Sequence, residues 1–247
     1  MKKKLRKIKL IIEYDGTEYF GWQVQPGMRT IQQEIEKSIY KITKERVRVT
    51  GAGRTDAGVH AYGQVAHFLT SSSIENNIFA PALNSVLPED ISVLTSKKVP
   101  TNFHARRSAT GKHYRYLIFN RRIPSPLARK RAYCLNVNLD VEKMKSSSLL
   151  FIGKKNYSSF ASNAKRKVDP IREISSVRVS KKGSFISIDV KGKSFMYKMV
   201  RAIAGTLVEI GNGKDLDINS IFKAKKRKYA GRNLPPHGLY LLKVYYT

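Results

Sequence analysis

Segment 51–61, Gly-Ala-Gly-Arg-Thr-Asp-Ala-Gly-Val-His-Ala, places one arginine and one carboxylate among small residues. Glycine permits positive φ and lets another backbone or a ligand approach closely. A carboxylate on such a turn, Asp56, with Arg54 two residues away, has the setting expected of a catalytic group. The same pattern also suits an Asx turn with a local ion pair. Asp56 and Arg54 are therefore the first candidates for chemistry.

A second candidate is the run His113-Tyr-Arg-Tyr116, in which aromatic and cationic side chains alternate. On a strand, Tyr114 and Tyr116 share a face. An exposed tyrosine among cations can stack on an RNA base, whereas a buried one packs in a core. Three basic groups, Arg106-Arg107, Arg121-Arg122 and Lys165-Arg166-Lys167, suit either phosphate contacts or a solvated face.

The charge balance points to a polyanionic partner, most simply nucleic acid. The 247 residues include 47 Lys+Arg and 18 Asp+Glu, which gives a formal net charge of +29. Residues 1–110 carry +7 of this charge and residues 111–247 carry +22. We therefore expect the second half to supply most of the electrostatic attraction.

Other features of the composition limit the class of protein. With 41% hydrophobic residues the chain can bury a core, so it is not a disordered basic tail. The single Cys134 cannot form an intramolecular disulfide, which fits a reducing compartment. Leu10-Ile11-Ile12 is too short for a signal peptide or a membrane span, so we expect a cytoplasmic protein without a membrane partner. The five histidines and Cys134 show no metal-ligand spacing.

Apolar periodicity predicts the elements that must hold these residues. In the first half we expect strands at 8–14, 46–50, 63–69 and 90–99, and helices at 31–42 and 79–87. Thr30 and Gln33 are spaced as a capping box for the first helix. The glycine segment then lies between two strands.

The second half of the chain is also expected to contain both strands and helices. We expect strands at 113–119, 173–180, 184–191 and 238–245, and helices at 140–151, 195–210 and 216–228. Asp140 is placed to cap its helix, and Arg201 lies off the apolar face of the helix 195–210. The order of elements predicts an α+β protein of two halves joined near 105–112.

Eight ordered blocks of the chain resemble the TruA family of tRNA pseudouridine synthases. The resemblance is strongest in the loop 53–61. It extends through Tyr14-Asp-Gly16 with Phe20-Gly-Trp-Gln23, Ala82-Leu-Asn84, Phe103-His-Ala-Arg106, Lys112-His-Tyr-Arg-Tyr116, Ser158-Ser-Phe160, Met199-Val-Arg201 with Gly205, and Gly238-Leu-Tyr-Leu241.

The resemblance implies two RNA-recognition-like α/β halves whose mainly antiparallel sheets are joined across a central active-site cleft. Residues 1–108 would form the domain with the catalytic Asp loop, and residues 109–247 the strongly basic domain that completes the cleft. It also implies a homodimer that converts uridine to pseudouridine at positions 38 to 40 of the tRNA anticodon stem-loop, without metal or cofactor. The matched residues imply catalytic roles for Asp56 as nucleophile, Arg54, Tyr114 and Arg201, and substrate contacts by Tyr114, Arg106, His60 and Leu241.

This reaction breaks the N1–C1′ bond of uridine, turns the base and joins C5 to C1′. A carboxylate can attack the nucleotide covalently or remove a proton. One alternative is a non-catalytic RNA-binding protein with the same fold, against which the intact Asp56 loop argues. A deaminase would need a zinc-ligand pattern, and a methyltransferase a Gly-rich nucleotide fingerprint; neither is recognisable in this sequence.

Overall fold

The computed structural model describes residues 5–162 and 169–247. The basic cluster Lys165-Arg166-Lys167 therefore lies outside the described residues. The chain forms two compact units. Unit 1 contains the residues up to Thr110 together with Leu241–Thr247, and unit 2 contains Gly111–Tyr240. The sequence interpretation kept the C-terminal strand with the second half, whereas the structure places most of that strand in unit 1.

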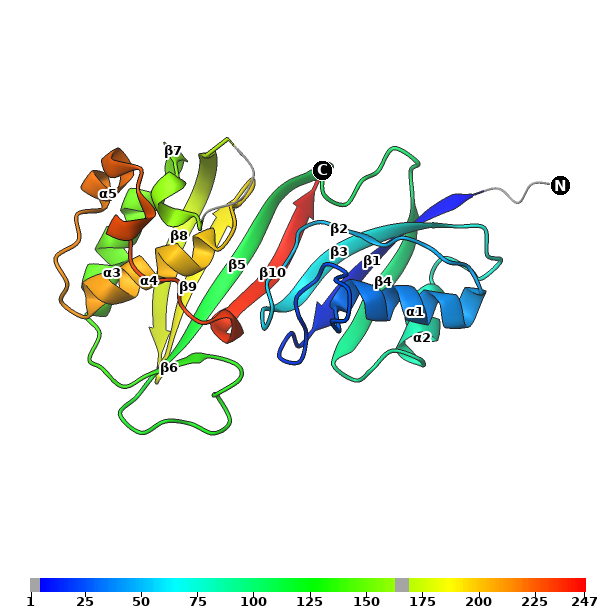
Figure 1. The fold of residues 1–247 in the computed structure, drawn as a ribbon, viewed down its shortest axis with the longest axis horizontal. Coiled ribbons are helices and arrows are strands. Elements are labelled where there is room, and N and C mark those ends of the chain that lie inside the picture. The colour runs from blue at the N-terminus through cyan, green and yellow to red at the C-terminus, as the bar shows by residue number, and fades with distance from the viewer. Residues whose placement is uncertain (1–4, 163–168) are drawn as a thin grey trace. The chain divides into compact units, whose positions relative to one another are not determined.

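Unit 1 is built on a sheet in the order β4-β1-β3-β10 (Figure 1). Its strands are β1 (Arg6–Tyr14), β3 (His60–Thr70), β4 (Ile91–Val99) and β10 (Leu239–Tyr246), with the short β2 (Thr50–Gly51) paired to β3. β1 runs antiparallel to both β3 and β4. Alternate residues of β1, from Ile8 to Tyr14, are buried, as the period-two pattern predicts.

Two helices cover this sheet, α1 (Ile31–Thr43) and α2 (Phe79–Asn84). α1 buries Ile31, Ile35 and Ile39, as predicted. The predicted capping box is wrong, because the Thr30 side chain makes no capping hydrogen bond. Backbone carbonyls of the preceding segment take over this role: Ile31 N donates to Gly21 O (3.2 Å) and Gln32 N to Trp22 O (3.0 Å).

The strand predicted at 46–50 is also wrong for most of its length, since only Thr50 is in a strand. The reason lies in the side chains of α1. Val49 N donates to Glu36 Oε1 (2.9 Å), and Val49 O accepts from Gln32 Nε2 (3.1 Å). The backbone of Val49 is thus paired with helix side chains instead of a neighbouring strand.

Unit 2 contains a sheet in the order β5-β9-β8-β7, with all three pairs antiparallel. Its strands are β5 (Ala109–Asn120), β7 (Gly153–Asn156), β8 (Ile171–Lys182) and β9 (Phe185–Gly192), and the short β6 (Tyr133–Leu135) runs parallel to β5. The predicted hairpin of β8 and β9 is confirmed, and Gly183 provides its turn with φ of 56°.

Three α-helices accompany this sheet: α3 (Val141–Ser148), α4 (Met199–Gly211) and α5 (Ile218–Ala224) (Figure 1). The Asp140 side chain caps α3 by accepting from Lys143 N, as predicted. α4 begins four residues later than predicted, after Lys198 with φ of 59°, and α5 ends at Lys225 with φ of 50°. Both units thus combine helices with mainly antiparallel strands, which confirms the predicted α+β class.

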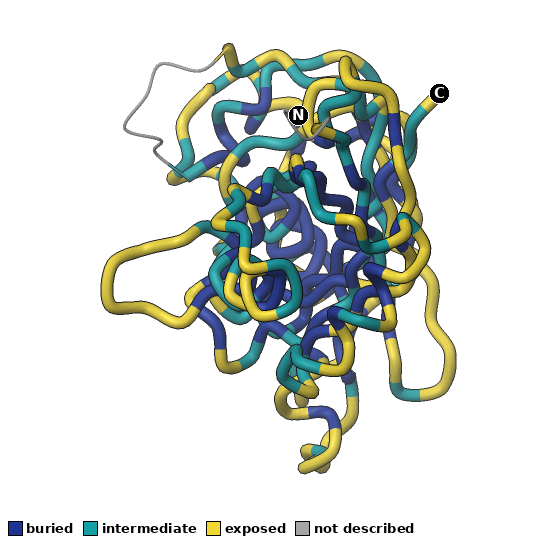
Figure 2. Tube along the Cα trace, turned by 90° about the vertical axis from the view of Figure 1, so that its right-hand side faces the viewer, coloured by how far each residue is buried: buried dark blue, intermediate teal, exposed yellow. Residues whose placement is uncertain are grey.

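In Figure 2 the loops that extend farthest outward are largely exposed, and buried positions are concentrated inside. Within the described parts of the chain, no helix is both long and apolar enough to cross a membrane.

Candidate active site

Asp56 lies in unit 1, on the loop that connects β2 to β3. The residue is half-buried, between buried Thr55 and exposed Ala57. Val59 N donates to Asp56 O (3.2 Å) to close a turn, in which Gly58 adopts a φ of 74°. The third position of such a turn requires the left-handed region that glycine enters without cost. The glycine at this place therefore sets the direction in which the loop presents Asp56.

The loop is fastened to residues that precede it by more than 30 positions in the sequence. Trp22 N donates to Thr55 O (3.0 Å), and Gly58 N donates to Tyr19 O (3.2 Å). These two bonds bracket Asp56 on both sides. Gly21 packs directly against this backbone: a Cβ there would lie 2.5 Å from Thr55 O and 3.0 Å from the carbonyl carbon of Asp56. The approach is possible only because Gly21 has no side chain.

A cluster of buried polar side chains forms hydrogen bonds with the loop. The hydroxyl groups of Tyr14 and Thr55 share a hydrogen bond of 2.8 Å, and Gln64 Nε2 donates to Gly53 O (2.9 Å). Burial raises the pKa of Tyr14 to about 12, although the hydrogen bonds from Thr55 and Gln64 lower it. Tyr14 therefore stays protonated at neutral pH and acts as a fixed hydrogen-bond partner.

His60 is buried, with 1% of its surface exposed. Its Nδ1 lies 2.9 Å from Asp15 Oδ1 and 3.2 Å from Gly16 N. Nδ1 donates to Asp15 when it carries a hydrogen and accepts from Gly16 when it does not. In either state His60 ties the end of the Asp56 loop to the end of β1.

Arg54 extends from the same loop and is exposed. The catalytic role expected of Arg54 stays a prediction, and its exposed position leaves it accessible to a bound substrate.

Arg106 and Leu241 also belong to unit 1 but have very different surroundings. Arg106 is exposed on the segment between β4 and β5, where its backbone N–H donates to His104 Nδ1 (3.2 Å). Leu241 is fully buried in β10. Exposure thus favours a substrate contact at Arg106, and the predicted contact at Leu241 gains no support from its burial.

The remaining predicted residues, Tyr114 and Arg201, lie in unit 2. Tyr114 is 8% exposed and contacts Phe195 edge to face, with ring centroids 5.0 Å apart. It shares the buried face of β5 with Tyr116, which is fully buried. Arg201, in the first turn of α4, donates from Nε to Leu234 O (2.6 Å). Its charge lowers the pKa of Tyr116, but burial dominates and raises it overall.

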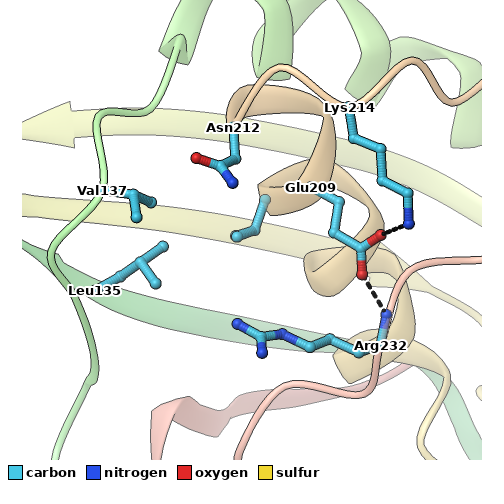
Figure 3. Close-up of a pocket in the computed structure, with 7 residues that line it drawn as sticks. Leu135, Val137, Glu209, Asn212, Lys214 and Arg232 are labelled. Carbon is cyan, nitrogen blue, oxygen red and sulfur yellow. Dashed lines mark hydrogen bonds and ion pairs between the residues drawn. The ribbon is translucent and has the colours of Figure 1, made fainter.

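Unit 2 also contains a pocket of about 350 Å³ that none of the predicted site residues lines. Its walls are Leu135, Val137, Val208, Glu209, Asn212, Lys214 and Arg232 (Figure 3). The Glu209 carboxylate inside it accepts hydrogen bonds from Lys214 Nζ and from the backbone N–H of Arg232, both 2.8 Å. These bonds tie α4 to the segment before β10. The Glu209 carboxylate therefore serves as a structural link between these two segments.

A half-buried carboxylate on a hydrogen-bonded loop, in an α+β chain of charge +29, is typical of a basic enzyme that acts on a polyanion. Comparison with known proteins narrows this class. Residues 10–106 and 148–247 match the tRNA pseudouridine synthase family. Two relatives named tRNA pseudouridine synthase A, from Acetivibrio thermocellus and Ruminiclostridium cellulolyticum, are 46% and 45% identical. Each alignment covers 98% of this chain and all of the relative.

A third relative, tRNA pseudouridine synthase A 2 from Clostridium perfringens, is 45% identical over the same shares of both chains. The chain therefore belongs to the tRNA pseudouridine synthase family. The matched ranges contain Asp56, Arg106, Arg201 and Leu241 but not Tyr114.

Sequence reasoning missed the residues that hold the loop. Tyr19, Gly21 and Trp22 contribute backbone contacts to it, and no spacing rule connects them to Asp56. Only the motif Phe20-Gly-Trp-Gln23 marked this segment, without indicating what it touches.

Proposed function

We propose that this protein converts uridine to pseudouridine in the anticodon stem-loop of tRNA, at positions 38 to 40, with Asp56 as nucleophile. The observation that carries the proposal is the Asp56 loop, which is bracketed by two backbone hydrogen bonds and partly open to solvent. Family membership supports the reaction and the tRNA substrate.

The reaction is an isomerisation, so nothing is gained or lost overall. The N1–C1′ bond breaks, the uracil turns, C5 joins C1′, and the proton of C5 is replaced by one on N1. The target base must leave the stack before Asp56 can reach it. Attack of the Asp56 carboxylate on the nucleotide would hold one fragment covalently while the other turns.

Other residues receive roles in the same proposal. Arg54 and Arg106, both exposed, would contact phosphates or the displaced base. Tyr114 would contact the uracil or help remove the C5 proton, and Arg201 would stabilise negative charge near Asp56 or on a phosphate. The resemblance assigns substrate contacts to His60 and Leu241 as well; the buried contacts of His60 support a role in positioning the loop, and Leu241 is fully buried in β10.

The quaternary state and the location belong to the proposal as well. The family resemblance supports a homodimer, and a tRNA substrate supports a cytoplasmic location. Light scattering distinguishes a dimer from a monomer of 28.0 kDa. A fully active monomer at micromolar concentration would contradict the dimer without affecting the proposed reaction.

Tritium release from tRNA labelled at uracil C5 tests the reaction directly, and carbodiimide mapping locates the product. We expect release by the wild-type protein and none by Asp56→Asn, which keeps the size of the side chain and removes its charge. Binding of tRNA by Asp56→Asn should remain close to wild type, because phosphate contacts dominate affinity. Substantial pseudouridine formation by Asp56→Asn would exclude Asp56 as the nucleophile.

A further inference from the structure

Residues 19–28, which we call the uncharged hairpin, form an unusual surface for this protein. The ten residues Tyr-Phe-Gly-Trp-Gln-Val-Gln-Pro-Gly-Met contain no charged side chain, although 26% of the whole chain is charged. Three of their apolar side chains are open to solvent: Phe20 (52% exposed), Met28 (41%) and Val24 (38%). Three exposed apolar side chains within nine residues are more than the scattered single ones expected on a soluble protein.

Hydrogen bonds within the chain hold the backbone of the hairpin. Its tip is a turn in which Gln25 and Met28 pair, with Pro26 and Gly27 between them and Gly27 at a φ of 71°. Phe20 N donates to Arg29 O (2.9 Å) across its two arms. At its base, Val24 N donates to the side-chain oxygen of buried Gln32 (3.2 Å). The backbone that carries the exposed side chains is thus fixed by hydrogen bonds within the chain.

The hairpin is also fastened to the candidate nucleophile's loop. The residues on both sides of Phe20 make the contacts described above: Tyr19 O accepts from Gly58 N, and Gly21 packs on the Asp56 backbone. Phe20 therefore extends from a segment whose backbone touches the loop on both sides of Asp56.

The chemistry of this surface selects its ligand. A phosphate needs cations or N–H donors. The uncharged hairpin has no cationic side chain, and its side-chain amides are engaged, since Gln23 Nε2 donates to Gln32 Oε1 (2.8 Å) and Gln25 Nε2 donates to Phe20 O (2.9 Å). Arg29, at its end, is engaged by Asp90 (3.4 Å) and stacks on Tyr19, 4.4 Å from the ring centroid. Exposed aromatic and apolar side chains instead bind the flat faces of unstacked bases, whatever their identity.

We propose that Phe20, flanked by Val24 and Met28, is a stacking surface for an unpaired RNA base next to the target uridine. The inference rests on the proposed function and adds a binding element to it: a base beside the target uridine leaves its own pair or stack and lies against Phe20. Phosphates of the same RNA would be held elsewhere, by the +29 charge of the remaining chain.

The test compares Phe20→Leu, Phe20→Trp and the control Phe185→Leu. Phe185 is another solvent-exposed phenylalanine (41%), but it lies in β9 of unit 2. The probe is an anticodon stem-loop RNA with 2-aminopurine beside the target uridine, titrated against each variant in the Asp56→Asn background. Base–aromatic stacking predicts roughly tenfold weaker binding for Phe20→Leu, with loss of the fluorescence change that stacking causes. Phe20→Trp and Phe185→Leu should bind like the parent.

Each outcome has a separate meaning, because wild-type tritium release is measured alongside. If the wild type releases no tritium, the proposed function fails. If the wild type is active and Phe20→Leu binds the probe as well as Phe185→Leu, the stacking surface is refuted. A change of oligomeric state in Phe20→Leu, seen by light scattering, would assign the surface to a second copy of the chain and overturn the inference.

Discussion

Gly21 offers the sharpest test of how the loop is positioned. Gly21→Ala introduces one methyl group where the nearest atoms belong to the backbone of Thr55 and Asp56. The new Cβ would lie 2.5 Å from Thr55 O, whereas ordinary contact begins at 3.4 Å. The hairpin and the Asp56 loop must therefore separate by about 1 Å, since backbone atoms cannot rotate away as a flexible side chain does.

Two costs follow from this substitution. The φ of 85° at residue 21 costs an alanine about 1–2 kcal/mol in folding stability, and the clash adds to it. Displacement of a reacting group by about 1 Å typically costs about 100-fold in rate. We therefore expect kcat for tritium release to fall roughly 100-fold, while the protein remains folded at 25 °C with a lower Tm.

Gly27→Ala is the matched control, because it separates backbone strain from displacement. Gly27 lies in the same hairpin with a φ of 71°, but no atom lies within 4 Å of its added Cβ. It should lose about 1–2 kcal/mol of stability through strain alone and keep its kcat. Equal kcat values for the two variants would refute the claim that the Gly21 contact positions Asp56.

Three further outcomes are expected. Tyr114→Phe should preserve the ring contact with Phe195 and therefore the Tm of the protein. If the Tyr114 hydroxyl helps to remove the C5 proton, the kcat of Tyr114→Phe should fall and a C5-deuterium isotope effect should emerge. Tyr114→Leu, which also loses the ring, should in addition bind tRNA less tightly. Burial, followed by His104 and Lys7, lowers the pKa of His67 from 6.5 to about 4, so the folded protein resists protonation and loses stability as the pH falls from about 6.5 to about 4. At 1.36 kcal/mol per unit, reduced for solvent screening, the loss is about 2 kcal/mol, and urea unfolding of His67→Asn should lack it. The affinity for tRNA should fall steeply with salt concentration. The slope of log binding constant against log salt concentration should be proportional to the number of phosphates that the protein contacts.

Much of the fold could be predicted because the signals were local. Alternation in β1, the apolar spacing of α1 and the Asp140 cap of α3 each depend on residues within a few positions of one another. The failures share a different cause. The first N–H groups of α1, which follow Thr30, donate to backbone carbonyls of the hairpin. The backbone groups of Val49 pair with side chains of α1. Local propensity does not encode such partners.

In the candidate site, too, one part could be predicted from local sequence and another part could not. Residue types marked Asp56 as a candidate, because a carboxylate among glycines is conspicuous, and the family resemblance then gave it the proposed catalytic role. Its supports, Tyr14, Gly21 and Gln64, come from three separate segments and act through backbone contacts or buried hydrogen bonds. The sequence therefore marks a candidate reacting group more readily than it marks the residues that hold that group in place.

The contacts of Gly21 and the exposure of Phe20 lead to a separation of kinetic effects. Both residues belong to the uncharged hairpin, but Gly21 faces the Asp56 backbone and Phe20 is open to solvent. If the hairpin positions the nucleophile and receives a base, Gly21→Ala should act mainly on kcat and Phe20→Leu mainly on KM. In the double variant the two losses need not add. A base that no longer stacks cannot help to order the displaced loop, so coupling between neighbouring residues of this kind is expected. Measured coupling would show that binding and positioning depend on one rigid segment, whereas strict additivity would mean that the hairpin performs two independent tasks.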